Sequence, residues 1–122
     1  MALGKTVATI LSNKTAAASN STTLTDCTTI DTAAVLMLGI GVKLTFNAAA
    51  TGKATVKVFA SPDDTNYDSE PCDEWDIPWE NATVSKTVPT LPAARYLKVQ
   101  VTNADAGQSI TAIYVYSHPL TG

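Results

Sequence analysis

The sequence predicts an all-β protein, a single antiparallel β-sandwich or jelly roll of about seven to eight strands with an extended N-terminal arm. Three observations support this fold class. Thr and Val are frequent, whereas the helix-favouring residues Leu, Glu, Lys and Gln are scarce. Apolar and polar residues alternate over short segments, as in strands that bury one face. Between those segments stand Gly, Pro, Asn and Asp, which favour turns.

Alternation of apolar residues defines the predicted strands. It is clear at residues 39–46, 54–60, 95–102 and 109–116, and weaker at 6–11, 75–79 and 83–88. In the strand at 39–46, every second residue from Ile40 to Phe46 is apolar, so one face should be buried. In the strand at 109–116, apolar side chains fall on both faces, so both should be partly covered.

The segments between the strands carry the turn residues that an antiparallel sheet needs. Residues 47–53 contain Thr51-Gly52 between two strong strands, which predicts a hairpin loop. Residues 61–68 are rich in Asp and Asn and predict a second connection. Residues 103–108 include Ala-Gly and should close the last hairpin.

The N-terminal quarter of the chain has a different composition. Residues 12–34 are rich in Ser, Thr, Asn and Ala and poor in large apolar side chains. Such a segment buries too little surface to offset the entropy that it loses on ordering. We therefore predict that residues 1–34 are an extended arm with one short strand, and that residues 35–122 form the sandwich domain. The arm either stays mobile or becomes ordered against a partner, as suits assembly on a lattice.

Size and charge exclude several classes of protein. A chain of 122 residues and 12.8 kDa has room for one domain. Its net charge of −3 and its eight Lys and Arg make nucleic acid a poor partner, because phosphate contacts need a concentrated positive face. The sequence contains no run of eighteen apolar residues, so no membrane-spanning helix is expected. The opening segment is too weakly apolar to predict a secretory signal.

Acidic residues are concentrated in one stretch that has no Lys or Arg. The stretch holds Asp63, Asp64, Asp68, Glu70, Asp73, Glu74, Asp76 and Glu80. The remaining chain is net positive, so charge is unevenly distributed along the sequence. The same stretch includes Tyr67 and both tryptophans, Trp75 and Trp79. It is therefore the candidate interaction surface, made of Tyr67, Asp68, Glu70, Trp75 and Trp79.

Three interpretations of this surface stay open. Alternating oxygen ligands from Asp64 to Glu70 resemble the start of a calcium loop, but Ser69 stands where an EF-hand needs Gly, and Trp75 where it needs Glu. A platform for sugars would use the aromatic rings together with the carboxylates. A protein contact, in which the acidic edge meets a basic neighbour, is the third interpretation and is favoured together with a merely solvated loop.

The sequence offers little for catalysis. His118 is the only histidine, and it precedes Pro119 near the end of the chain, where we expect an exposed tail. A Ser or Cys nucleophile would therefore lack an evident base. The sequence has no Gly-rich phosphate loop and no zinc-type cluster of Cys and His. We expect no catalytic residues, no metal ligands and no cofactor.

Cys27 and Cys72 are the candidate disulfide pair, since the chain has no other cysteine. A bridge would join the N-terminal arm to the acidic stretch and could add about 4 kcal/mol of stability by restricting the unfolded chain. The alternative is two free thiols made in a reducing cytoplasm, which we favour.

Two motifs resemble those of a known class of proteins. The segment from Ala54 to Asp68 is a strand followed by Ser-Pro-Asp-Asp-Thr-Asn-Tyr, and it resembles the strand and SxDGxNW/Y turn of small β-sandwich structural proteins of tailed-phage virions. The segment from Tyr96 to Asn103, Tyr-Leu-Lys-Val-Gln-Val-Thr-Asn, is similar to the strand that follows in those proteins. The sequence differs at Asp64, where that pattern has Gly.

The resemblance implies a virion structural protein, made in the host cytoplasm, that serves as a head decoration protein or a tail or neck accessory protein. It implies no catalytic residues. It further implies that the major capsid or tail protein of the same particle is the partner, and that the chain is a homo-oligomer, with a trimer favoured. The alternative function is a carbohydrate-binding module that recognises a host surface, for which the rings of Trp75 and Trp79 would have to be exposed.

Overall fold

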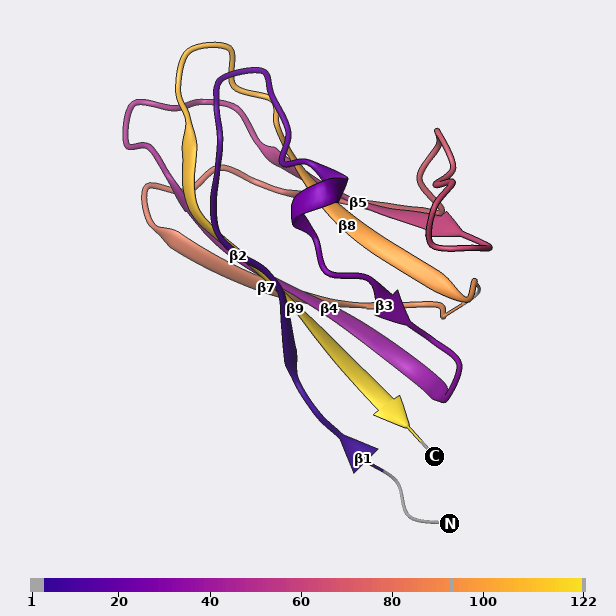
Figure 1. Cartoon of the computed structure of the whole chain (residues 1–122). Helices are drawn as coiled ribbons and strands as arrows, with labels where there is room; N and C mark the ends of the chain where they lie inside the picture. The colour runs from indigo at the N-terminus through magenta and orange to yellow at the C-terminus, as the bar shows by residue number, and fades with distance from the viewer. Residues whose placement is uncertain (1–3, 93, 122) are drawn as a thin grey trace.

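The structure, a computed structural model, describes residues 4–92 and 94–121. It is a sandwich of two antiparallel sheets (Figure 1), which confirms the predicted all-β class. The five-stranded sheet, called sheet A, contains β1 (Gly4–Lys5), β2 (Ala8–Ala16), β4 (Val35–Phe46), β7 (Thr83–Thr90) and β9 (Ile110–Thr121). The four-stranded sheet, sheet B, contains β3 (Ile30–Asp31), β5 (Ala54–Ser61), β6 (Asp73–Ile77) and β8 (Tyr96–Asn103). A 3-10 turn, η1 (Leu24–Asp26), connects the sheets.

The pairing of the strands sets the order of each sheet. In sheet A, β1 and β2 pair with successive parts of β9, and β4 lies between β9 and β7. In sheet B the order is β3, β8, β5, β6. All the predicted strands are present, and several extend beyond their predicted bounds: β2 continues to Ala16, β4 begins at Val35 and β9 continues to Thr121. Within the described part of the chain, no helix is long and apolar enough to cross a membrane.

The core lies between the two sheets and consists mainly of β-branched and leucine side chains. Alternation places every second residue of β4 and of β8 inside, as the sequence predicts. The largest fully buried side chains are Leu11, Ile40, Leu44, Ile77, Leu97, Ile110 and Ile113 together with five valines.

The extended arm predicted for residues 1–34 is not found in residues 4–34, which belong to the sandwich. The β2 strand pairs with β9 along most of its length, and Leu11 is only 1% exposed. Further along the chain, the Thr22 amide donates to the Val101 carbonyl, and the Val101 amide donates to the Thr22 hydroxyl. Pairing with β9 and β8 provides hydrogen-bond partners for the backbone amides and carbonyls of this segment. The segment can therefore stay ordered in the sandwich with few large apolar side chains. The part of the prediction that concerns residues 1–3 lies outside the described residues.

The free edges of both sheets have features that hinder the addition of another strand. The β2 edge is irregular, with three register shifts and a left-handed Asn13 (φ 49°). The β7 edge contains Pro89, and the β6 edge is five residues long and includes three acids. The β3 edge has only two residues. A partner is therefore expected to bind through side chains, on the faces or ends of the sandwich.

Candidate functional site

The five residues of the candidate interaction surface do not gather in one place. Asp68 lies beside the end of β5, where its amide donates to the Ala60 carbonyl at 3.0 Å. Trp79 lies near the opposite end of the sandwich, where its indole N–H donates to the Asn47 carbonyl at 3.1 Å. From Ala54 to Ala60, β5 covers the distance between these two ends, about 20 Å at about 3.3 Å per residue. Tyr67 and Glu70 share the loop of Asp68, so the predicted surface divides into two separate parts.

Both tryptophan rings pack against the hydrophobic core. Trp75 and Trp79 are half-buried and contact the core cluster from its β6 side. The Trp75 Nε1 atom is buried and has no hydrogen-bond partner among the described residues. These rings therefore do not form the freely exposed platform that the sugar-binding hypothesis requires of them.

The acidic residues at the start of the connection from β5 to β6 form a hydrogen-bonded turn. The Asp63 carboxylate accepts bonds from the backbone amides of Thr65 (2.9 Å) and Asn66 (2.8 Å). These amides hold the pKa of the Asp63 carboxyl well below its usual range. The Asp64 carboxylate accepts bonds from the hydroxyls of Thr29 and Tyr67, both at 2.6 Å. Desolvation, followed by the bond to Asp64, raises the pKa of Tyr67 to about 12.

This turn bears on the calcium interpretation. The oxygens of Asp63 and Asp64 that a cation would need already accept hydrogen bonds within the turn. Among residues 4–92 and 94–121, no three His, Cys, Asp or Glu side chains stand close enough together to hold a metal ion. In this structure, the two carboxylates act as turn-forming groups.

The backbone conformation of Asp64 is one that glycine adopts easily, and glycine stands at this position in the resembling motif. Asp64 has a φ of 59°, in the left-handed region that favours Gly and that Asp tolerates better than most residues. The aspartate adopts this left-handed conformation, and its carboxylate accepts hydrogen bonds from Thr29 and Tyr67. The turn of the resembling proteins is therefore compatible with the substitution.

Replacing Asp64 tests this account of the turn. Asp64→Ala loses the two hydroxyl contacts and keeps a Cβ at positive φ, whereas Asp64→Gly loses the contacts and relieves the backbone. We expect Asp64→Ala to melt about 3–6 °C below Asp64→Gly. Thermal unfolding followed by circular dichroism measures the difference, and equal melting temperatures for the two variants would contradict the account.

The candidate disulfide between Cys27 and Cys72 is not formed, and both cysteines are free. Cys27 is buried beside β8, and its sulfur accepts a bond from the Val99 amide at 3.3 Å. Cys72 is exposed just before β6, where its amide donates to the Val58 carbonyl on β5. Because β5 separates β8 from β6, about 10 Å of sheet lies between the two positions. Burial raises the pKa of the Cys27 thiol.

The acidic residues are absent from the strands of sheet A, whereas the strands of sheet B contain both acids and lysines. The strands of sheet A contain four lysines, Lys5, Lys14, Lys43 and Lys86, and no acidic residue. All eleven acidic residues lie in sheet B or in the connections. Four of them follow the β6 side of the sandwich and form no ion pair or side-chain hydrogen bond among the described residues. We call this group the acidic edge: Asp68, Glu70, Glu74 and Glu80.

The outer face of sheet A carries a row of aromatic side chains from β9. Tyr114 and Tyr116 stack with ring centroids 6.3 Å apart and planes inclined by 5°. The Lys43 ammonium lies 6.0 Å from the centre of the Tyr114 ring. His118 follows on the same face, since the register sets these residues opposite the outward-facing residues of β4. We call this surface the aromatic face: Lys43, Tyr114, Tyr116 and His118.

The sequence predicted that His118 lies in an exposed tail, and this prediction is wrong. His118 is part of β9, is half-buried, and packs its ring over Gly41 of β4. A Cβ at Gly41 would stand 2.8 Å from His118 Nε2, so the glycine leaves the space that the ring occupies. The expectation failed because β9 extends further toward the C-terminus than the alternation alone predicted.

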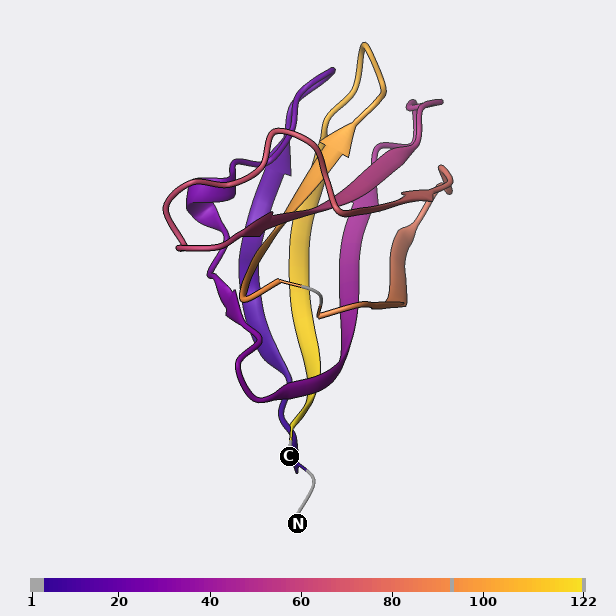
Figure 2. The same cartoon turned by 90° about the vertical axis from the view of Figure 1, so that its right-hand side faces the viewer.

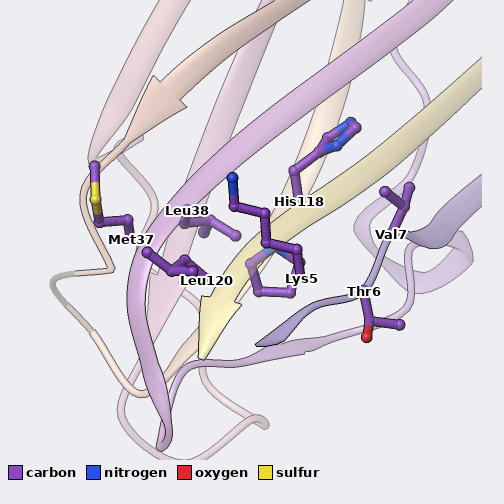
Figure 3. Close-up of a pocket in the computed structure, with 8 residues that line it drawn as sticks. Lys5, Thr6, Val7, Met37, Leu38, His118 and Leu120 are labelled. Carbon is purple, nitrogen blue, oxygen red and sulfur yellow. The ribbon is translucent and has the colours of Figure 1, made fainter. Parts of the chain in front are cut away.

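One end of the sandwich, which we call the apolar end, carries the largest exposed apolar side chains. They are Val7 (58% exposed), Leu36 (55%), Met37 (63%) and Leu91 (78%). Two neighbouring hollows of about 370 and 350 Å³ lie there and share Met37 and Leu38 as lining residues. Figure 3 shows the first hollow, with Lys5 and His118 on its border. Figure 2 shows that the chain enters and leaves the sandwich at this same end.

Sequence reasoning missed the apolar end because its members are far apart in the chain. Val7, Leu36 and Leu91 come from three segments that only the sheet topology brings together. Val7 lies within a predicted strand and Leu91 is a single apolar residue beside a predicted strand, and neither is unusual by itself. The local signal was the pair Leu36-Met37, which extends the apolar pattern of the 39–46 strand toward the N-terminus.

Comparisons with known proteins bear on the fold. No family model matches the chain, and no curated protein matches its sequence. Among solved structures, PBSX exported protein XepA aligns with a TM-score of 0.60 and 15% identity, over 96% of this chain and 37% of that one. Dimeric latent PorU from Porphyromonas gingivalis aligns with a TM-score of 0.54 and 10% identity, over 98% of this chain and 13% of that one.

A third similar structure is that of Bacillus endospore appendages, with a TM-score of 0.45 and 17% identity, over 98% of this chain and 88% of that one. The chain therefore spans well under half the length of the first two proteins. At these identities the likeness concerns architecture, and it shows that this β-sandwich occurs within larger proteins, XepA and PorU among them.

Proposed function

We propose that this protein is a non-enzymatic structural component of a virion, a capsid decoration or stabilisation protein that attaches to the major capsid protein through the apolar end. The observation that carries the proposal is the gathering of four exposed, large apolar side chains around two hollows at one end of the fold. Clustered apolar surface of this kind marks an interaction site on a monomer.

The energetics favour this end as the attachment site. Burying one large apolar side chain contributes about 1.5–3 kcal/mol, so the four residues of the apolar end could together supply a useful affinity. Many copies on one particle would gain further through multivalency. Because the strand edges are irregular, short or interrupted by proline, attachment by adding a strand is disfavoured.

The motifs and the fold are in keeping with this role. Asp64 has a left-handed backbone, a conformation that favours glycine, and glycine is the residue at this position of the resembling phage motif. The structural neighbour XepA is described as an exported protein, which fits a product that acts outside the cell in which it is made. A tail or neck position in the same particle is the other placement that these observations support.

Binding to particles tests the proposal. Capsids produced from the encoding genome with this gene deleted are mixed with purified protein and sedimented. We expect wild-type protein to co-sediment, and Met37→Asp and Leu91→Asp to lose binding by about a hundredfold, since a buried charge opposes apolar contact. Ala48→Asp, which makes the same change at an exposed turn beyond the opposite end of β4, serves as the control. Unchanged binding of both apolar-end variants would contradict the proposal.

The carbohydrate-binding alternative makes a different prediction. It requires glycan binding that Trp75→Ala or Trp79→Ala removes without unfolding the protein. The packing of both rings against the core is evidence against it, because truncating them should lower stability first. A glycan array with wild-type protein, together with melting curves of the two variants, distinguishes the alternatives.

A further inference from the structure

We propose that the first hollow of the apolar end receives an aliphatic side chain of the attachment partner, and that Lys5 pairs with a carboxylate that stands beside this side chain in the partner. The pairing rests on the proposed function, attachment through the apolar end, and it names the chemistry of the segment that attaches. An exposed apolar surface alone would accept many apolar segments, whereas a charge at its border selects among them.

The first hollow lies where three neighbouring strands of sheet A meet at the apolar end. Lys5 of β1 and Met37 of β4 are both register partners of Leu120 on β9. Residues directly opposite one another in antiparallel strands point to the same face, so these three side chains form one row. The apolar residues of the lining are Val7, Met37, Leu38, Pro119 and Leu120. A volume of about 370 Å³ is near the lower limit of about 300 Å³ for ligand pockets, which suits a short apolar segment.

The Lys5 side chain extends over this apolar lining. Figure 3 shows it with Leu38 and Leu120 on one side and His118 on the other. Lys5 is exposed, and its ammonium forms no ion pair among the described residues. A partner segment that fills the hollow therefore meets this charge.

No carboxylate of the described chain offsets the Lys5 charge at this hollow. The residues that line it include no acid, and the described strands of sheet A contain none either. The second hollow differs, because Asp73 lies in its lining and accepts a hydrogen bond from the Thr90 hydroxyl at 2.5 Å. The first hollow is therefore the cationic part of the apolar end.

This charge decides which apolar segments can fill the hollow. A purely apolar segment would remove water from the Lys5 ammonium and offer no hydrogen-bond acceptor in its place, which is unfavourable. A basic segment would be repelled. An Asp or Glu beside the aliphatic side chain replaces the lost water with a charge-assisted hydrogen bond, so a segment of this kind is the preferred occupant.

Small probes test the preference of the hollow without the particle. Hexanoate, hexanol and hexylammonium share one aliphatic chain and differ in the charge of the head group. Nuclear magnetic resonance of protein labelled with carbon-13 at its methionine methyl groups reports binding through Met37, whose signal the variant Met37→Leu identifies. We expect hexanoate to bind about threefold more tightly than hexanol, as an exposed ion pair provides, and hexylammonium to bind most weakly. Equal binding of hexanoate and hexanol, or no response to hexanoate, overturns the proposal.

Variants of Lys5 assign the preference to its ammonium. We expect Lys5→Gln to bind hexanoate and hexanol equally, and Lys5→Glu to prefer hexylammonium. Lys43→Glu is the matched control, because it makes the same change of charge on the aromatic face of the same sheet, beside Tyr114 and outside the lining of the hollow. It should keep the wild-type preference, and melting curves confirm that all variants are folded. A preference for hexanoate that survives Lys5→Gln overturns the assignment to Lys5.

Co-sedimentation with capsids separates this pairing from the attachment itself. We expect Lys5→Glu to bind capsids at least about tenfold more weakly than wild type, and Lys43→Glu to bind like wild type. Lys5→Gln should lose less, and its difference from wild type should disappear near 1 M NaCl, where screening limits charge attraction to about 3 Å. Equal binding of wild type and Lys5→Glu would leave the attachment standing and overturn the carboxylate partner. If wild-type protein does not bind capsids at all, the attachment is wrong and the pairing is wrong with it.

Discussion

Replacing Gly52 by Ala is expected to destabilise the protein by about 2–3 kcal/mol, because the new methyl group has no room. A Cβ at this position would stand 2.6 Å from the backbone nitrogen of Asp105 and 2.7 Å from its Cα. These are main-chain atoms, which cannot rotate away as a side chain can. Relief requires the connection from β4 to β5 to move away from the connection from β8 to β9.

Gly39→Ala is the matched control for this prediction. A Cβ at Gly39 would meet its nearest atom, His118 Cβ, at 3.4 Å, and the next is Thr87 Cγ2 at 3.7 Å, which are ordinary contacts. We expect a change in unfolding free energy within about 0.5 kcal/mol. Urea denaturation of both variants measures the effects, and similar midpoints for the two would show that the close approach at Gly52 does not limit stability.

The second large effect concerns the Asp105 carboxylate, which holds the same two connections together. It accepts hydrogen bonds from the backbone amides of Thr51 (2.7 Å), Gly52 (2.9 Å), Gly107 (2.8 Å) and Gln108 (2.8 Å). Asp105→Ala would leave four amides without this acceptor at a site that is 8% exposed. We expect the melting temperature to fall by about 10 °C or more.

The same carboxylate makes stability depend on pH. The four amides hold the pKa of Asp105 well below the value of about 3.9 that it has when unfolded. A pKa lowered by folding adds stability above the unfolded value, and that stability is lost as the pH falls toward the folded one. We therefore expect wild-type protein to lose stability below about pH 5, with a shallower dependence in Asp105→Asn.

Asp26→Asn is the control for the pH experiment. Its carboxylate is exposed and accepts no backbone hydrogen bond within the described residues; its nearest cation is Lys14 at 3.9 Å. This variant should keep the wild-type dependence, including the share that comes from the turn at Asp63. Melting temperatures between about pH 2 and pH 7 provide the comparison. Identical curves for wild type and Asp105→Asn would contradict the role assigned to the carboxylate.

Much of the fold followed from local pattern. The alternation around Ile40 and around Val99 predicts strands with one buried face, and both residues are completely buried. Thr51-Gly52 marks a connection between two strands, as predicted, although the reason for the glycine is its contact with Asp105 and not a left-handed backbone. Such features depend on a few neighbouring residues, which is why one sequence is enough to predict them.

The N-terminal segment shows where local pattern is insufficient. Its composition predicted an arm, because residues such as Ala16 and Thr22 bury little surface each. The structure holds them by pairing with β9 and β8, strands that follow about 80 to 100 residues later. Backbone hydrogen bonds leave no periodic trace in the sequence, so the partner of a weak strand cannot be read from its own residues.

The sequence by itself determined the all-β class, the approximate strands and the concentration of acids between Asp63 and Glu80. Only the tertiary structure decided that Val7, Leu36 and Leu91 meet at one end, and that the ring of His118 packs over Gly41. The physical reason is that burial and turn formation act over short stretches of chain, whereas a surface is created by the order in which distant strands pair.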